Sequence, residues 1–190
     1  AATATHAVNL AERALALPIS ETKALVIGGG SVGLFAALTL AHRGVKDLTL
    51  ADTNALRRQS AEKTGVANVI NPIDGPVVDA TFDLVVDGVG GKATRQASVA
   101  AVMPGGVIMH IGLMDNDGGV DVRRLTLQEI TFIGTYTYTP LDLRVTLAQL
   151  HEGALGSLDW IDERPLAEGG AAFEELHAGR CGAPKVILRP

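Results

Sequence analysis

Short apolar runs alternate with longer segments of helical periodicity along most of the chain. Runs with the composition of buried strands lie at 24–27, 48–51, 67–70, 82–87, 106–111, 130–134 and 185–188. Segments with helical spacing lie at 32–42, 54–63, 92–102, 141–151 and about 168–178, after a lead-in helix within 1–21 that Pro18 closes. Strands that alternate with helices in this order predict a doubly wound α/β fold. We expect two βαβαβ halves and three layers, with a parallel sheet in the middle.

The composition supports one buried domain over residues 1–190. Hydrophobic residues make up 47% of the chain, and charged residues make up 19%, against an average of about 25%. A chain this apolar must bury surface on several sides, and a parallel sheet covered on both faces does so. The composition therefore excludes a disordered protein.

Charge and cysteine content exclude several classes of function. The net charge is −5 and the longest basic runs are the pairs Arg57-Arg58 and Arg123-Arg124, which argues against a nucleic-acid-binding face. The single cysteine, Cys181, excludes a disulfide within the chain and an all-cysteine zinc site. Two stretches without charged residues, 24–41 and 96–114, are each broken by a glycine-rich turn, so we expect no membrane span. We expect a cytoplasmic protein.

A glycine-rich turn follows the first predicted strand and opens the next helix. Gly28, Gly30 and Gly33 form the pattern G-x-G-x-x-G, which in this context is typical of a dinucleotide site in a Rossmann fold. The first glycine permits the tight turn, the second lets the backbone approach a pyrophosphate, and the third lets helix and strand pack closely. The amides of Ser31 and Val32 would then face the phosphates. The alternative is a tight turn that binds no ligand.

An acidic residue stands where the dinucleotide pattern requires one. Asp52 ends the second predicted strand, 19 residues beyond Gly33. A carboxylate there accepts hydrogen bonds from the adenosine ribose and repels a 2′-phosphate, so NAD is favoured over NADP. The alternative is that Asp52 caps the helix that begins near Asn54. Arg57 and Arg58 weaken the preference for NAD, because a nearby guanidinium can hold a 2′-phosphate.

The sequence shows no motif for catalysis with a bound dinucleotide. The five histidines and one cysteine form no recognisable metal set, and we predict neither a catalytic residue nor a metal ligand in this chain. His110 lies near the carboxyl end of a predicted strand, where we expect a buried, hydrogen-bonded histidine. Asp83 and Asp87 flank one strand and are interpreted as structural.

Seven segments, taken in order, resemble the cofactor-binding domain of the medium-chain dehydrogenase/reductase superfamily, of the zinc-type alcohol and polyol dehydrogenase kind. These segments are THAVNLAERA, ALVIGGGSVGLFAALTLAHRG, LADTNALRRQSAEKTGVANVINP, FDLVVDGVGG, MPGGVIMHIGL, ITFIGTYTYTP and APKVILRP. The resemblance runs from about His6 to Leu188, nearly the whole chain.

The resemblance implies a set of cofactor-binding residues at the ends of the strands. It implies Gly28, Gly30, Ser31, Val32 and Gly33 for the pyrophosphate; Asp52 for the adenosine ribose, with Thr53 and Arg57 beside it; Val89 and Gly90 for the rim of the adenosine pocket; Ile111, Gly112, Leu113 and Thr135 for the nicotinamide end; and Lys185 near the pyrophosphate.

The resemblance also implies an activity. Members of the family transfer a hydride between an alcohol or carbonyl substrate and nicotinamide, and their catalytic domain supplies the substrate contacts and, in some members, zinc. We expect that domain to be absent from this chain, and therefore expect the chain alone to be inactive. Two other hypotheses stay open: a stand-alone, non-catalytic module that binds or senses NAD(H), and a doubly wound domain without a dinucleotide.

Finally, the resemblance suggests how two chains meet. In many members an edge strand pairs with its copy across a twofold axis. The candidates here lie within 120–138, namely Val120-Asp121-Val122 and Ile130–Tyr138. An unpaired apolar edge strand is prone to such pairing, so we expect a homodimer.

Overall fold

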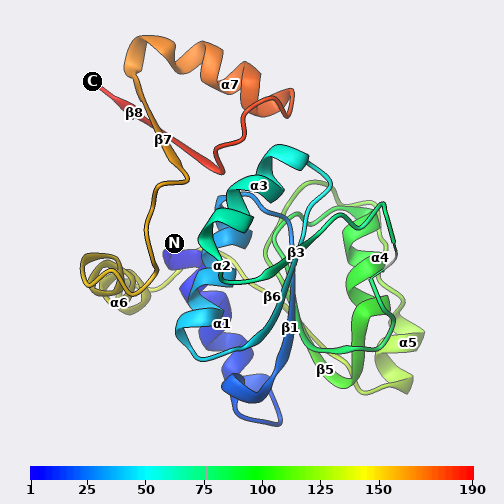
Figure 1. Cartoon of the computed structure of the whole chain (residues 1–190). Helices are drawn as coiled ribbons and strands as arrows, with labels where there is room; N and C mark the ends of the chain where they lie inside the picture. The colour runs from blue at the N-terminus through cyan, green and yellow to red at the C-terminus, as the bar shows by residue number, and fades with distance from the viewer. Residues whose placement is uncertain (76) are drawn as a thin grey trace.

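The computed structural model describes residues 1–75 and 77–190, and its centre is a six-stranded, all-parallel sheet (Figure 1). The strands lie in the order β3-β2-β1-β4-β5-β6, which confirms the doubly wound Rossmann topology. Their bounds are β1 (Lys23–Ile27), β2 (Asp47–Ala51), β3 (Asn68–Ile70), β4 (Phe82–Asp87), β5 (Val102–His110) and β6 (Thr131–Gly134).

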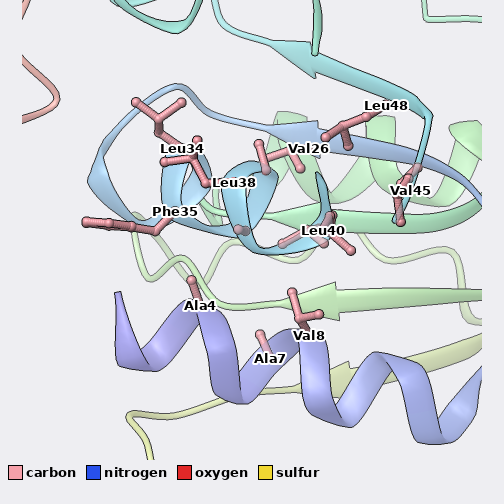
Figure 2. Packing of buried hydrophobic residues seen from close by; sticks show 14 of the residues in the cluster. Ala4, Ala7, Val8, Val26, Leu34, Phe35, Leu38, Leu40, Val45 and Leu48 are labelled. Atoms are coloured by element: carbon pink, nitrogen blue, oxygen red, sulfur yellow. The ribbon is translucent and has the colours of Figure 1, made fainter. Parts of the chain in front are cut away.

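Helices cover both faces of this sheet and complete the three layers. The helices are α1 (Ala2–Ala14), α2 (Ser31–His42), α3 (Ala55–Thr64), α4 (Lys92–Ala101), α5 (Val122–Leu127) and α6 (Pro140–His151), with a short 3₁₀ helix at Ile19–Glu21. Alternate residues of a strand face opposite sides. Accordingly, Val26 of β1 packs among residues of α1 and α2 (Figure 2), whereas the adjacent Leu25 packs with Val99 of α4. Both faces are therefore apolar, as the composition indicates.

The end of the chain forms a separate small sheet. Strands β7 (Ile161–Pro165) and β8 (Lys185–Arg189) pair in parallel, joined by a 3₁₀ turn (Leu166–Glu168) and α7 (Gly169–His177). In Figure 1 this unit lies beyond α3, apart from the large sheet. The predicted last strand therefore exists, but outside the six-stranded sheet. The sequence pattern missed β7 because three of its five residues are charged.

Three boundaries differ from the sequence prediction. The predicted strand at Val120-Asp121-Val122 is wrong: Asp121 instead caps α5, its side chain accepting a hydrogen bond from the Arg124 amide at 3.0 Å. A capping carboxylate favours a helix start over an extended edge. Strand β5 begins at Val102, four residues before the predicted start, and α1 ends at Ala14 rather than near Pro18. Among residues 1–75 and 77–190, no helix has the length and apolarity that a bilayer span requires.

The start of α2 lies unusually close to the end of β1. A Cβ atom added to Gly33 would lie 1.8 Å from the carbonyl oxygen of Gly28, and Gly28 itself has a φ of +102°. Only glycine satisfies both requirements, since other residues rarely adopt such a φ and any Cβ would overlap the carbonyl. This contact explains the first and third glycines of the sequence pattern.

Helix α6 turns polar residues towards the rest of the molecule and leaves most of its leucines exposed, Leu150 being the one that packs against the core. Asp142 and Thr146 are buried, whereas Leu143 and Leu147 are 38% and 56% exposed. The Thr146 hydroxyl bonds the Thr5 hydroxyl of α1 at 2.8 Å. The amphipathic pattern therefore locates the helix but does not predict which face is buried.

Asp142 is the centre of this helix–helix contact. It accepts hydrogen bonds from the Asn9 side chain at 2.9 Å and from the Thr139 amide at 2.8 Å, and its Oδ2 lies 2.8 Å from His6 Nδ1. Burial by itself raises the pKa of this carboxyl, but the hydrogen bonds from Thr139 and Asn9 and the nearby His6 outweigh it and lower the pKa to about 2.

We predict that Asp142→Asn lowers the free energy of unfolding at neutral pH by about 1–2 kcal/mol. Because the folded pKa is depressed, the carboxylate stabilises the fold fully above the unfolded pKa and loses this effect as pH falls towards about 2. The difference between variant and wild type should therefore narrow below about pH 4 in urea unfolding curves. Asp79→Asn, at an exposed aspartate, is the control; an equal effect at all pH values contradicts the prediction.

We also predict that Gly33→Ala lowers the free energy of unfolding by about 3 kcal/mol, because the methyl group overlaps the Gly28 carbonyl. The gain in helix propensity, about 1 kcal/mol, is smaller. Calorimetry should show a melting temperature lower by roughly 10 °C. The matched control is Gly30→Ala, where an added Cβ meets nothing within 4 Å; equal melting temperatures for the two variants would contradict this account.

Candidate functional site

The carboxyl ends of five strands lie side by side in register. Residues Ala51, Ile27, Asp87, His110 and Gly134 are successive partners across β2, β1, β4, β5 and β6. The loops that follow these strands therefore begin at one edge of the sheet, which is where ligands bind in doubly wound folds. All of the predicted cofactor residues except Lys185 lie on these loops or at the helix start that follows them.

The N-terminus of α2 presents free amides at this edge. Gly30 is the N-cap of α2 and provides no capping side chain, and the amides of Ser31, Val32 and Gly33 have no acceptor among the described residues. A Cβ added to Gly30 would point into open space. Unpaired amides at a helix N-terminus, with its partial positive charge, form an anion-binding arrangement.

Asp52 is fixed beside the glycine turn. It is 7% exposed, and its Oδ2 accepts a hydrogen bond from the Gly29 amide at 2.6 Å while Oδ1 accepts one from the Asn54 amide at 2.7 Å. Asn54, not Asp52, caps α3, since its side chain accepts from the Leu56 and Arg57 amides. Asp52 therefore joins the end of β2 to the glycine turn, and each oxygen keeps a further lone pair for a ligand.

The two arginines after Asp52 have different surroundings. Arg58 is engaged, because its Nη1 donates to the carbonyl oxygens of Asp52 and Thr53, both at 2.9 Å. The guanidinium of Arg57 has neither a hydrogen bond nor an ion pair within the described part of the chain, and its Cβ lies 3.5 Å from where a Gly29 Cβ would be. Arg57 is thus the cation placed next to Asp52 and the turn.

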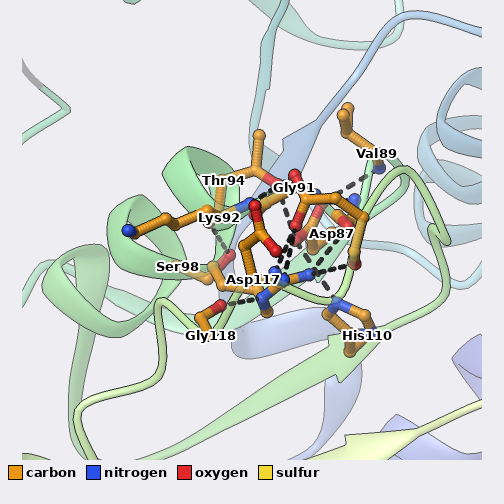
Figure 3. Close-up of polar contacts among 12 residues, drawn as sticks. Asp87, Val89, Gly91, Lys92, Thr94, Ser98, His110, Asp117 and Gly118 are labelled. Atoms are coloured by element: carbon orange, nitrogen blue, oxygen red, sulfur yellow. Dashed lines mark hydrogen bonds and ion pairs between the residues drawn. The ribbon is translucent and has the colours of Figure 1, made fainter.

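Asp87 organises the loop after β4 (Figure 3). Its side chain is fully buried; Oδ1 accepts from the Val89 and Gly90 amides at 2.9 and 2.8 Å, and Oδ2 accepts from the Thr94 hydroxyl at 2.9 Å. This confirms a structural role for Asp87. Asp83 has a similar role, accepting from the Lys23 amide at 2.8 Å.

The loops after β4 and β5 touch backbone to backbone. A Cβ added to Gly90 would lie 1.9 Å from the Gly112 carbonyl oxygen, and one added to Gly112 would lie 2.0 Å from the Val89 carbonyl carbon. Glycine is therefore needed at both positions. The predicted adenosine rim and the predicted nicotinamide end form one continuous wall.

His110 and Thr135 carry buried polar atoms without partners at this edge. His110 Nε2 lies 3.9 Å from Asp87 Oδ2, beyond hydrogen-bonding distance, and the ring packs against Phe132. The expected hydrogen bond is therefore wrong: neither this nitrogen nor the Thr135 hydroxyl, in a residue 8% exposed, has a partner among the residues described. A buried hydroxyl without a partner is costly unless a ligand or water satisfies it.

Lys185 lies apart from the other predicted residues. It is the first residue of β8, in the small sheet. Its charge acts on the N-terminus of the chain: burial first, and then the charge of Lys185, lowers the pKa of the Ala1 amino group. Within residues 1–75 and 77–190, no group of three or more His, Cys, Asp or Glu side chains is placed to hold a metal ion.

Sequence reasoning missed two contributors to this edge. It did not predict that Asp87 holds the loop after β4 through the Val89 and Gly90 amides. It also did not single out Arg95, an arginine of α4 that is only 6% exposed. The available signals were two aspartates, Asp115 and Asp117, in a loop with Gly118 and Gly119, and one arginine in a helix that otherwise carries mainly small residues.

Comparison with known proteins places this geometry in a family. The model of the zinc-binding dehydrogenase family matches residues 31–152. L-threonine 3-dehydrogenase of Saccharopolyspora erythraea is 27% identical over 189 residues, which cover 95% of this chain and 54% of that protein. The same enzyme of Streptomyces avermitilis is 29% identical, with coverage of 95% and 55%. The chain thus spans about half the length of these relatives.

Solved structures show the same fold. Acetophenone reductase of Geotrichum candidum, in complex with NAD, superposes with a TM-score of 0.86 at 22% identity, covering 99% of this chain and 52% of that one. Alcohol dehydrogenase of Aeropyrum pernix also gives 0.86, at 21% identity, with coverage of 100% and 55%. Together with the family match over well over half of the chain, this confirms the resemblance in the sequence: the protein belongs to the zinc-binding dehydrogenase family.

Proposed function

We propose that this chain binds NAD(H) as the cofactor-binding domain of an alcohol dehydrogenase-like oxidoreductase. The observation that carries the proposal is the open N-terminus of α2, whose amides at Ser31, Val32 and Gly33 have no acceptor in the described structure. Asp52 stands beside them with free lone pairs. The similar structures of acetophenone reductase with NAD and of Bacillus subtilis yhfP with NAD support the choice of cofactor for this chain.

The residues at the sheet edge fit each part of a dinucleotide. The pyrophosphate would lie on the free amides at the start of α2, where the missing Cβ of Gly30 leaves room. Asp52 would accept hydrogen bonds from the adenosine ribose, beside Thr53. The adenosine would pack near Val89 and Gly90.

The nicotinamide end would meet the wall formed after β5 and β6. Ile111, Gly112 and Leu113 would provide main-chain contacts, and the buried Thr135 hydroxyl would gain the partner it lacks. When bound, nicotinamide supplies the hydride acceptor or donor, and the protein's role is to hold and orient it.

The substrate and the proton transfer would come from outside these residues. The chain spans about half the length of its curated relatives, and a small alcohol or carbonyl substrate would be held by a catalytic domain, with zinc in that domain if the enzyme uses it. We infer that the chain alone binds the cofactor without turning over an alcohol.

We expect NAD(H) to bind at least tenfold more tightly than NADP(H), because the Asp52 carboxylate repels a 2′-phosphate more than Arg57 attracts it. Titration calorimetry of the purified chain measures both. Equal affinities contradict the role given to Asp52.

In the same titrations Gly30→Val should lose NAD binding while keeping its circular dichroism spectrum, since its side chain fills the proposed pyrophosphate position. Unchanged NAD binding by this variant contradicts the proposed site.

We further propose a homodimer through the outer edge of β6. In the described part of the chain β6 pairs only with β5 and forms one end of the sheet. Thr131 and Gly134 are exposed, while Phe132 and Ile133 are half-buried. A free strand edge with apolar side chains is suited to pairing with a second copy.

Light scattering at tens of micromolar should therefore give twice the chain mass. Thr131→Lys should give monomers, because edge lysines oppose strand pairing, whereas Gln59→Lys on the distant α3 should remain dimeric. Monomeric wild-type protein at these concentrations contradicts the dimer.

A further inference from the structure

We propose that Arg95 is a positioning residue for the cofactor. In this proposal, which rests on the proposed function, Arg95 holds the loop after β5, residues 111–119, against the loop after β4. It thereby sets the position of the main chain that follows Gly112, beginning at Leu113, where the nicotinamide end would lie.

The guanidinium of Arg95 joins the two loops directly. Nη1 donates to the Gly90 carbonyl oxygen at 2.8 Å and to the Asp115 carbonyl oxygen at 3.0 Å, and Nη2 donates to Asp115 Oδ1 at 2.6 Å. Nε donates to the carbonyl oxygen of Gly118. All three nitrogens are thus used, and the planar fork of arginine fixes the angles between their partners.

The buried charge of Arg95 depends on its ion pair with Asp115. Arg95 is 6% exposed, and a cation so buried requires a counter-charge and hydrogen bonds. Asp115 is the counter-charge: the hydrogen bond from Arg95, and then that from the Lys92 amide, holds the pKa of its carboxyl below the usual value. The carboxylate is therefore ionised at neutral pH and keeps the pair intact.

Asp115 also accepts a hydrogen bond from the first amide of α4. Its Oδ2 accepts from the Lys92 amide at 3.1 Å, and its Oδ1 accepts from the Asp117 amide at 3.2 Å. In Figure 3 the loop that carries Asp117 and Gly118 accordingly lies beside Lys92 and the first turn of α4. The first amide of α4, that of Lys92, is thus bonded within the protein, whereas the first amide of α2, that of Ser31, has no acceptor among the described residues.

The amides of Ile111 and Gly112 are held by the Asp87 carbonyl oxygen at 2.9 and 3.0 Å. Beyond Gly112, the direct bonds between the two loops are longer than those made by Arg95. The Met114 amide donates to the Val89 carbonyl oxygen at 3.2 Å, and the Asp115 amide donates to the Gly90 carbonyl oxygen at 3.3 Å. The Gly90–Gly112 approach leaves no side chain between the loops. Arg95 is therefore the side chain of α4 that holds the part of the β5 loop beyond Gly112.

The loop after β4 does not depend on Arg95 to the same extent. Asp87 holds Val89 and Gly90 through Oδ1, and Thr94 supports Asp87 from the other side. Removal of the Arg95 guanidinium should therefore release the β5 loop and leave the adenosine side of the edge intact. The proposal predicts different effects on the two ends of the cofactor.

The test is titration of the full chain with NADH and with ADP-ribose, which lacks the nicotinamide ring. Arg95→Met should bind NADH about tenfold more weakly and ADP-ribose within about twofold of wild type, because only the nicotinamide end loses its support. Arg95→Lys should recover part of the NADH affinity. The matched control is Arg123→Met, since Arg123 is an exposed arginine of α5. Thr94→Val, which removes the support of Asp87 on the adenosine side, should weaken NADH and ADP-ribose binding by similar factors, because both compounds carry the adenosine half.

A second readout does not need the cofactor. Amide hydrogen exchange of residues 113–119 should be faster in Asp115→Asn and Arg95→Met than in wild type, while the amides of 31–42 should be unchanged. This measurement also covers the case in which a variant is too unstable for titration, because Asp115→Asn removes a charge at a partly exposed position.

Several outcomes overturn the proposal. These are unchanged NADH affinity in Arg95→Met, equal loss of NADH and ADP-ribose affinity, and unchanged exchange in residues 113–119. Wild-type protein that binds NADH no more tightly than ADP-ribose also overturns it, since the β5 loop then does not contact nicotinamide. Wild-type protein that binds neither compound instead shows that the proposed function is wrong.

Discussion

The approach of Gly33 to the carbonyl oxygen of Gly28 is the contact on which the rest of the site depends. With no Cβ between them, the first turn of α2 lies directly over the carboxyl end of β1. That position points the amides of Ser31 and Val32 at the sheet edge, where Asp52 is held by the Gly29 amide. The parallel register of the strands then brings the loops after β4, β5 and β6 to the same edge. A larger residue at position 33 would displace the helix start and with it the anion-binding amides.

The two βαβαβ halves of the fold share one topology but differ at the N-terminus of their first helix. In the first half the helix N-terminus has no capping side chain, and the amides of Ser31, Val32 and Gly33 have no acceptor among the described residues. In the second half Asp115 and Thr94 bond the Lys92 and Gly91 amides at the corresponding helix start, and charged side chains hold the loops together. Asp87 and Arg95 are the centres of that second arrangement. The first half thus leaves backbone amides available to a ligand, whereas the second half uses side chains to hold two loops against each other.

Local sequence patterns predicted most of the fold and the glycine turn. They failed for elements whose buried face is set by contacts with residues distant in the sequence. The strand that ends at Ile27 and the turn after it depend on residues a few positions apart, so the sequence pattern locates them. Asp52 is predictable because its spacing from the turn follows from one βαβ unit. By contrast, β7 is mostly charged and α6 buries Asp142 while exposing Leu147. Those elements depend on which surfaces meet, and apolar periodicity carries no information about a polar contact between helices.

The sequence by itself determined the order of most strands and helices, the position of the glycine-rich turn and the acidic residue beside it. These features follow from hydrophobic spacing and from the conformations that only glycine adopts, which act within a few residues. Only the tertiary structure decided that Arg95 joins Gly90 to Asp115, that the buried Thr135 hydroxyl has no partner among the described residues, and that the last strand lies outside the main sheet. The reason is physical: a buried charge or hydroxyl is defined by its partners, and these partners come together only when distant loops fold onto the same edge.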